Sequence, residues 1–70
     1  MKMTPVESSN IKALGYDPDT QVLAAEFLNG TTYHYDAVPP PIFDTLMAAE
    51  SKGSAFNTLV KKGGFDFKKQ

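Results

Sequence analysis

The sequence predicts an α+β fold in which a three-stranded antiparallel β-meander is followed by two short helices and a short C-terminal strand. Turn signals divide the first half into β-rich segments, prolines end the sheet, and two amphipathic helical segments follow. A run of strands before a run of helices favours an antiparallel sheet with helices on one face. The 70 residues suffice for one domain with one core, which we expect to be ordered from about residue 6 to residue 67.

The first strand is expected at Val6–Tyr16, after an N-terminal segment, Met1–Pro5, that we expect to be frayed. Strict alternation along this strand places two sets of residues on opposite faces. One set is Ile11, Ala13 and Gly15, and the other is Lys12, Leu14 and Tyr16. The strand ends in a turn at Tyr16–Thr20, because Pro18 fixes a φ angle suited to a turn and the flanking aspartates bond the local backbone.

The second strand is expected at Gln21–Leu28, where apolar side chains recur with a period of two. A helix is the competing interpretation for Val22–Glu26, but the turns on either side leave a segment more typical of a strand. The Asn29-Gly30 pair predicts a type I′ hairpin turn, which requires positive φ at both central residues. A third strand, Thr31–Asp36, follows and is rich in the β-branched and aromatic residues that strands favour.

Three prolines, Pro39–Pro41, end the sheet, because proline cannot donate to a β-ladder yet suits the first turn of a helix. A helix is therefore expected at Ile42–Glu50. Its apolar face has the i, i+3, i+4 spacing of an amphipathic helix and consists of Phe43, Leu46 and Met47.

A second helix is expected to begin at a serine cap, either Ser51 or Ser54, and to extend to about Lys62. Its apolar face has the same spacing and consists of Phe56, Leu59 and Val60. The glycines that follow end this helix. The alternating segment Phe65–Phe67 then predicts a short last strand, or an extended tail packed on the sheet.

The composition argues against an enzyme and against a metal site. Without cysteine the chain has no disulfide or thiolate site, and the only histidine, His34, makes a zinc site unexpected, so we predict no metal and no cofactor. His34 is also the only histidine that could act as the base of a nucleophilic triad. We interpret His34 as an exposed residue of a strand. The alternative is that it contacts Ser8 or Ser9.

No apolar run approaches the roughly 20 residues that span a bilayer. The N-terminus also does not resemble a signal peptide. We therefore expect a cytoplasmic protein with no membrane partner.

The charges are distributed unevenly, although the net charge is only −1. Residues 1–50 carry two lysines and seven acidic residues, whereas residues 51–70 carry five lysines and one acidic residue. Two interpretations follow: the basic end forms a local anion-binding patch, or it is a solvated segment that keeps the protein in solution.

Several short motifs occur in a defined order: Ser8-Ser9-Asn10-Ile11, Gly15-Tyr16-Asp17, Phe27 with Asn29-Gly30, Tyr33-His34-Tyr35, Val38-Pro39, Ala49, Ser51-Lys52-Gly53-Ser54 and Phe56-Asn57. Their order and spacing resemble the KTSC domain, over about residues 6–67. This family occurs alone in small bacterial and phage proteins, and at the C-terminus of some lysyl-tRNA synthetases. The resemblance implies no known activity, but the synthetase association suggests RNA binding.

One segment departs from the family pattern. Where the family commonly has an Ile-Arg-like basic position, this chain has Leu59–Lys62. Lys61 keeps the positive charge but lacks the planar guanidinium that binds phosphate with two hydrogen bonds. An anion site here is therefore expected to bind less tightly.

Two groups of candidate binding residues lie in the predicted sheet. Tyr33 and Tyr35 share one face of the third strand, where they form either a platform for stacked bases or part of the core beneath the helices. Ser8 and Ser9, with the adjacent Asn10, either bind a phosphate or carboxylate or satisfy nearby backbone groups.

The remaining candidates lie on the second helix. A helix N-terminus favours anions, and Lys52 would add a positive charge, although a simple cap with a solvated lysine is the alternative. The candidates in this segment are Ser51, Lys52, Ser54, Asn57, Lys61 and Lys62.

The leading hypothesis is a non-catalytic module that binds a nucleotide-containing anion, with RNA as the expected partner. One alternative is a protein–protein adaptor that uses a sheet edge or the helical face. The other is a small-nucleotide-binding protein, which would need a concave pocket lined by the tyrosines or the serines.

Overall fold

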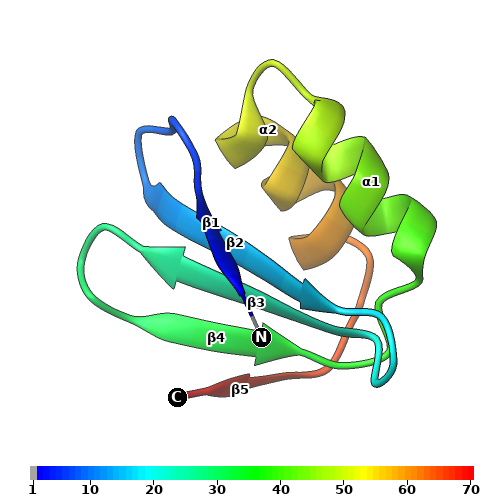
Figure 1. Ribbon diagram of the computed structural model, residues 1–70. Coiled ribbons are helices and arrows are strands. Elements are labelled where there is room, and N and C mark those ends of the chain that lie inside the picture. Colours follow the sequence, from blue (N-terminus) through cyan, green and yellow to red (C-terminus); the bar gives the residue numbers. More distant parts are fainter. Residues whose placement is uncertain (1) are drawn as a thin grey trace.

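The computed structural model describes residues 2–70 as a five-stranded antiparallel sheet with a helical layer on one face (Figure 1). The strands lie in chain order and are β1 (Met3–Pro5), β2 (Ile11–Asp17), β3 (Val22–Phe27), β4 (Thr32–Tyr35) and β5 (Phe67–Lys69). The helical layer consists of α1 (Pro40–Ala48), α2 (Lys52–Phe56) and a π-helical turn, η1 (Asn57–Lys61). The predicted α+β class, with an antiparallel sheet followed by helices, is confirmed.

Strand β1 occupies residues that the sequence predicts to be frayed. Met3 pairs with Gly15 of β2, and Pro5 pairs with Ala13. Proline is tolerated because β1 is an edge strand, so one side of its backbone needs no partner in the sheet. The prediction of a frayed end is therefore wrong for residues 3–5, and Met1 lies outside the described residues.

A turn at residues 8–10 shortens the expected first strand, so β2 begins at Ile11 rather than Val6. The Ser8 hydroxyl oxygen accepts hydrogen bonds from the backbone N–H groups of Asn10 and Ile11, both at 3.4 Å. Serine side chains that bond nearby backbone groups in this way compete with strand pairing. The sequence alone does not reveal this turn, because serine and asparagine also occur within strands.

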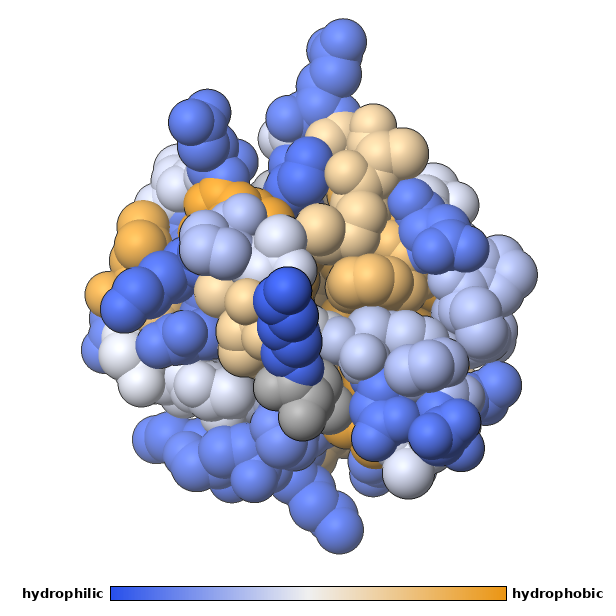
Figure 2. Space-filling model, in the orientation of Figure 1, coloured by the Kyte–Doolittle hydropathy of each residue, from blue (hydrophilic) through white to orange (hydrophobic). Residues whose placement is uncertain are grey.

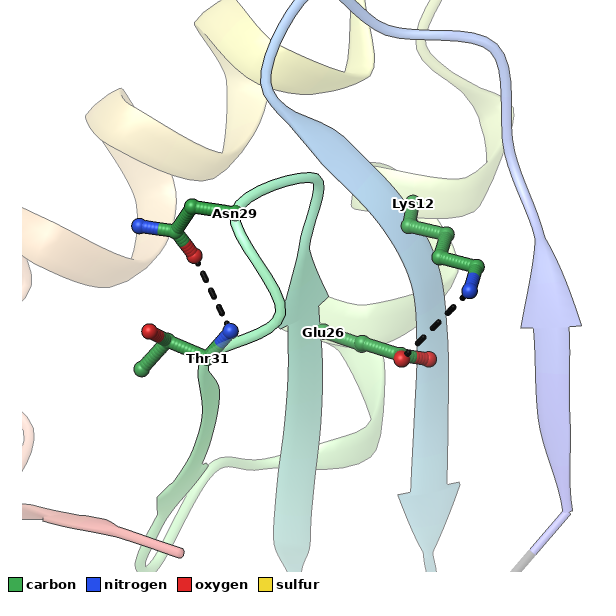
Figure 3. Close-up of polar contacts among 4 residues, drawn as sticks. All are labelled: Lys12, Glu26, Asn29 and Thr31. Atoms are coloured by element: carbon green, nitrogen blue, oxygen red, sulfur yellow. Dashed lines mark hydrogen bonds and ion pairs between the residues drawn. The ribbon is translucent and has the colours of Figure 1, made fainter.

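A β-bulge at Lys12 changes which residues of β2 face the core. Ile11 pairs with Phe27 and Ala13 pairs with Glu26, so Lys12 is an extra residue between them. Ile11 and Leu14 consequently both lie in the core, whereas strict alternation places them on opposite faces. The exposed Lys12 ammonium instead lies 3.8 Å from a carboxylate oxygen of Glu26 (Figure 3).

The β3–β4 hairpin forms at the expected asparagine–glycine pair but not with the expected type I′ geometry. Gly30 has a φ of 90°, whereas Asn29 does not have a positive φ. The Gly30 N–H donates to the Phe27 carbonyl at 3.0 Å, and the Phe27 N–H donates to the Thr31 carbonyl at 2.8 Å. This pattern is a three-residue loop, in which a type I turn is followed by a left-handed glycine.

Both predicted helices form, with small shifts in their ends. The prolines occupy the first turn of α1, which therefore begins at Pro40 rather than Ile42. Ser51, one of the two expected caps, precedes α2, and its hydroxyl oxygen accepts the Ser54 N–H at 3.4 Å. The helix continues through η1 to Lys61, so the second helical segment ends where the sequence predicts.

The core lies between the sheet and the helical layer. Its buried members are Ile11, Leu14, Leu23, Ala25, Tyr35, Val38, Leu46, Phe56 and Val60. The predicted apolar faces of both helices contribute to it, and their other members, Phe43, Met47 and Leu59, are partly buried against it. None of the helices in residues 2–70 is long and apolar enough to cross a membrane.

Strand β5 forms two residues later than predicted, at Phe67–Lys69 instead of Phe65–Phe67. Tyr35 pairs with Phe67, and Tyr33 pairs with Lys69. The Asp36 N–H also donates to the Asp66 carbonyl at 2.8 Å. Paired residues lie on the same side of a sheet. The side chains of Phe67 and Lys69 are therefore on the face that carries the two tyrosines.

Candidate functional site

Tyr35 is a core residue and has only a small part of its surface exposed. It is 5% exposed, and its ring packs edge-on against that of Phe56 with centroids 5.4 Å apart. Burial raises the pKa of the Tyr35 hydroxyl, and the neighbouring Tyr33 raises it further. The structure thus gives Tyr35 a packing role, whereas Tyr33 is only half-buried.

A groove of about 350 Å³ opens between the C-terminal half of the sheet and η1. It is lined by Phe27, Tyr33, Tyr35, Val60, Lys61, Phe65 and Phe67, and we call it the aromatic groove. Tyr33 lies edge-on to both Phe27 and Phe67, with centroids 5.8 Å and 5.6 Å away. Phe67 is 58% exposed, so the groove presents aromatic surface to solvent.

The π-helical turn positions Lys61 at this groove. The Lys62 N–H donates to the carbonyl of Asn57, five residues earlier, at 3.1 Å, as in a π-helix. With this winding Val60 is buried and Lys61 is exposed. The Lys61 ammonium lies 5.6 Å from the Phe27 ring centroid and 6.0 Å from that of Phe56, within the range of a cation–π interaction.

A second hollow of about 330 Å³ adjoins the aromatic groove. It is lined by Asn10, Phe27, Asn29, Tyr33 and Lys61, and we call it the amide hollow. Phe27, Tyr33 and Lys61 line both depressions, which therefore adjoin at these three residues. The turn before β2 and the β3–β4 hairpin each supply one asparagine.

A third depression, of about 560 Å³, lies at the start of α2, and we call it the serine hollow. It is lined by Glu7, Ser8, Ser9, Asn10, Glu50, Ser51, Lys52, Gly53, Ser54 and Asn57. Several of its polar groups already have partners in the chain. The Lys52 ammonium donates to the Ala49 carbonyl at 2.8 Å, near the C-terminus of α1, and Ser51 caps α2. The carboxylates of Glu7 and Glu50 make this hollow less favourable for an anion than the amide hollow.

His34 is not brought together with a serine. It pairs with Ala24 of β3 and Lys68 of β5, and β3 separates its strand from β2. Ser8 and Ser9 precede β2 and line the serine hollow, to which His34 does not contribute. Within residues 2–70 no three histidine or acidic side chains gather as a metal site would require.

The KTSC domain family matches residues 7–65, which is most of the chain. This chain belongs to the KTSC domain family. The crystal structure of a KTSC domain protein from Yersinia pestis superimposes with a TM-score of 0.88 at 41% sequence identity. The alignment covers 99% of this chain and 96% of that chain.

Relatives of this KTSC domain include both small proteins and part of a large one. A protein of Tsukamurella paurometabola is 58% identical over 59 residues, covering 84% of this chain and 88% of the relative. An uncharacterised protein of Stutzerimonas stutzeri is 44% identical over 61 residues, covering 87% of this chain and 86% of the relative. A lysine–tRNA ligase of Nostoc punctiforme is also 44% identical over 61 residues, but the match spans only 11% of the ligase.

The structure divides the candidate residues of this KTSC domain between two places. Tyr33, Tyr35 and Lys61 line the aromatic groove. Ser8, Ser9, Ser51, Lys52, Ser54 and Asn57 line the serine hollow. Lys62 lines none of the three depressions. The tyrosines and Lys61 therefore converge on one surface, whereas Lys52 lies elsewhere.

Sequence reasoning did not single out Phe27, Phe65, Phe67 or Asn29 as members of a site. A usable signal existed for two of them, because Phe65 and Phe67 alternate in the same way as Tyr33 and Tyr35. Asn29 gave no such signal, since an asparagine before glycine is sufficiently explained by the turn.

Proposed function

We propose that this KTSC domain is a non-catalytic module that binds single-stranded RNA through the aromatic groove. The observation that carries the proposal is the position of the Lys61 ammonium over the half-buried Phe27 ring, in a groove that also contains the exposed ring of Phe67. Single-stranded nucleic acids are bound by this combination of aromatic surface for the bases and positive charge for the backbone. Each stacked base contributes about 1–3 kcal/mol, as estimated by alanine substitution.

The charges around the groove support the same proposal. Within residues 2–70 the Lys12 ammonium forms an ion pair with Glu26, whereas the Lys61 ammonium forms none with a carboxylate. Lys69 pairs with Tyr33 across the ladder and so lies on the groove side of the sheet. Lys68 pairs with His34 and so lies on the opposite face, and Lys62 lines none of the three depressions. Lys61 and Lys69 therefore supply the positive charge on the groove side of the sheet.

The family relationship adds support of a different kind. A domain of this family lies within a protein named lysine–tRNA ligase, at 44% identity to this chain. Association of a small module with a tRNA-dependent enzyme is consistent with a role in RNA binding. This support is by analogy, and the whole ligase is not comparable with this chain because the match spans 11% of it.

Binding of a free nucleotide is a second candidate, favoured by the concavity of the groove. Its volume of about 350 Å³ falls within the roughly 300–1,000 Å³ of small-molecule sites.

A role as a protein–protein adaptor receives less support. Within residues 2–70 the large apolar side chains that are strongly exposed are those of Leu28 and Phe67. The apolar surface visible in Figure 2 lies mainly over α1, where hydrophilic residues interrupt it.

A fluorescence titration with single-stranded RNA and with transfer RNA at low salt tests the proposal. We expect single-stranded RNA to bind with a dissociation constant of about 1–100 μM at physiological salt, and more tightly at low salt. Thermal-shift measurements with free nucleotides test the second candidate in parallel. Absence of RNA binding at high micromolar protein would refute the RNA proposal.

A further inference from the structure

The amide of Asn29 has a fixed orientation at the edge of the amide hollow. Its Oδ1 accepts the backbone N–H of Thr31 at 2.9 Å. Because a backbone N–H can only donate, the oxygen of the amide must be the atom that faces Thr31. The NH2 group is left for another partner, and Figure 3 shows this nitrogen directed away from the hairpin, toward the helical layer.

The amide of Asn10 is fixed in the same sense by a different network. The Ser8 oxygen accepts two backbone N–H groups, so its own proton is free to be donated elsewhere. That proton is directed to Asn10 Oδ1, which lies 3.0 Å from the Ser8 oxygen. The Asn10 NH2 group is again left over, and within residues 2–70 neither asparagine NH2 group has a hydrogen-bond acceptor.

The amide hollow therefore presents hydrogen-bond donors and one positive charge. Asn10, Asn29 and Lys61 line it, together with Phe27 and Tyr33, and no acidic residue does. A site of this composition favours a group with several acceptor oxygens and a negative charge, and phosphate has both. The serine hollow differs here, because it includes two glutamates.

We propose that one nucleotide spans both depressions, with its base in the aromatic groove and its phosphate in the amide hollow, bound by Asn10, Asn29 and Lys61. The two depressions adjoin at Phe27, Tyr33 and Lys61, which is what a nucleotide needs, since its base and phosphate are covalently joined and must lie close together. This inference rests on the proposed function and assigns the contacts that would carry it.

Two isosteric variants, Asn29→Asp and Asn10→Asp, test the site. Aspartate keeps the oxygen that accepts from Thr31 or Ser8 but replaces the NH2 donor with a second, negative oxygen. Gln21→Glu is the matched control, because it makes the same charge change at an exposed residue at the other end of β3. Circular dichroism and thermal unfolding establish that each variant is folded.

Each protein is titrated with a uridine oligonucleotide, uridine monophosphate, uridine and inorganic phosphate. Two-dimensional NMR follows the side-chain NH2 signals of the two asparagines. We expect each aspartate variant to weaken oligonucleotide binding at least about tenfold, which corresponds to about 1.4 kcal/mol. The asparagine NH2 signals should shift with the oligonucleotide and monophosphate and remain in place with uridine.

The outcomes separate the two proposals. If the wild-type protein binds RNA and both aspartate variants behave like Gln21→Glu, the phosphate site is overturned and the RNA function stands. If the monophosphate binds with shifts of the two NH2 signals but the oligonucleotide does not bind, the phosphate site stands for a free nucleotide and the RNA function is overturned. If neither binds, both proposals are overturned.

Discussion

The ammonium of Lys61 lies 5.6 Å from the centroid of the Phe27 ring, so a cation from the helical layer sits beside an aromatic ring of the sheet. This relationship depends on the π-helical turn and on the end of β3, which are far apart in the sequence. An ammonium held over aromatic surface and not engaged in an ion pair is available to a phosphate.

Lys61 substitutions should change RNA affinity much more than stability. Lys61→Gln should lower the slope of log K against log salt by about 0.7, because one phosphate contact is lost. The cation–π interaction contributes only about 0.5–1 kcal/mol at an exposed position, so the melting temperature should change little. Lys61→Arg should strengthen binding, since guanidinium binds phosphate with two hydrogen bonds. Equal salt slopes for all three proteins would contradict this role.

Phe56 and Phe67 should respond in opposite ways to alanine substitution. Phe56 is buried against Tyr35 and Phe27, so Phe56→Ala should cost about 3–5 kcal/mol and unfold much of the protein. Phe67 is 58% exposed, so Phe67→Ala should remain folded but bind RNA more weakly by about 1–3 kcal/mol, the contribution of one stacked base. Chemical denaturation and RNA titration measure the two effects. An RNA affinity unchanged in Phe67→Ala would remove this ring from the site.

A side chain added at Gly53 should lower stability modestly. A Cβ atom added there would lie 2.8 Å from the Ser8 hydroxyl oxygen and 2.9 Å from Asn10 Oδ1, so these two side chains would have to move. Alanine also favours a helix by up to about 1 kcal/mol over glycine, which offsets part of the overpacking cost of about 1–3 kcal/mol. We expect Gly53→Ala to lower stability by about 1 kcal/mol, or roughly 4–8 °C in melting temperature for a domain of this size.

Ser54→Ala is the control for this substitution, because only the backbone N–H of Ser54 takes part in the cap. Its melting temperature should match that of the wild-type protein. A Gly53→Ala variant as stable as Ser54→Ala would show that the turn at Ser8 and Asn10 yields without cost.

Stability should decline in alkaline solution because two tyrosines have raised pKa values. Burial, followed by the charges of Asp44 and Asp17, raises the pKa of Tyr16 above the ordinary 10.0. Burial and then Tyr33 raise that of Tyr35. The neutral hydroxyl is thus favoured in the folded state, so this contribution is complete below pH 10.0 and is lost as pH rises through the folded pKa.

Urea unfolding at pH values below and above 10.0 measures this effect. The Tyr16→Phe and Tyr35→Phe variants should each lose less stability over this range than the wild-type protein does. A decline identical in all three proteins would assign the alkaline sensitivity to other groups.

The sequence predicts much of the fold because local signals agree with one another. The apolar spacing of Phe56 and Val60 and the cap at Ser51 correctly indicate the second helix. The aromatic and β-branched residues of β4 likewise indicate a strand. These features depend on neighbours in the chain, so a single sequence is enough to predict them.

The remaining features depend on contacts between distant segments. The Lys12 bulge follows from pairing with β3, and no local pattern distinguishes it from regular alternation. Strand β1 has only three residues and forms because the edge of β2 is available to pair with it. For the same reason the sequence suggested Tyr33 and Lys61 separately, but their meeting with Asn29 is a result of tertiary packing.

Fluorescence anisotropy of a labelled uridine oligonucleotide, titrated with the wild-type protein and with the double variant Lys61→Gln/Phe67→Ala, tests the central claim most directly. The account predicts wild-type binding with a dissociation constant of about 1–100 μM at physiological salt. It also predicts binding at least tenfold weaker, or about 1.4 kcal/mol, for a double variant that is still folded. Wild-type protein that does not bind, or a folded double variant that binds equally well, would contradict it.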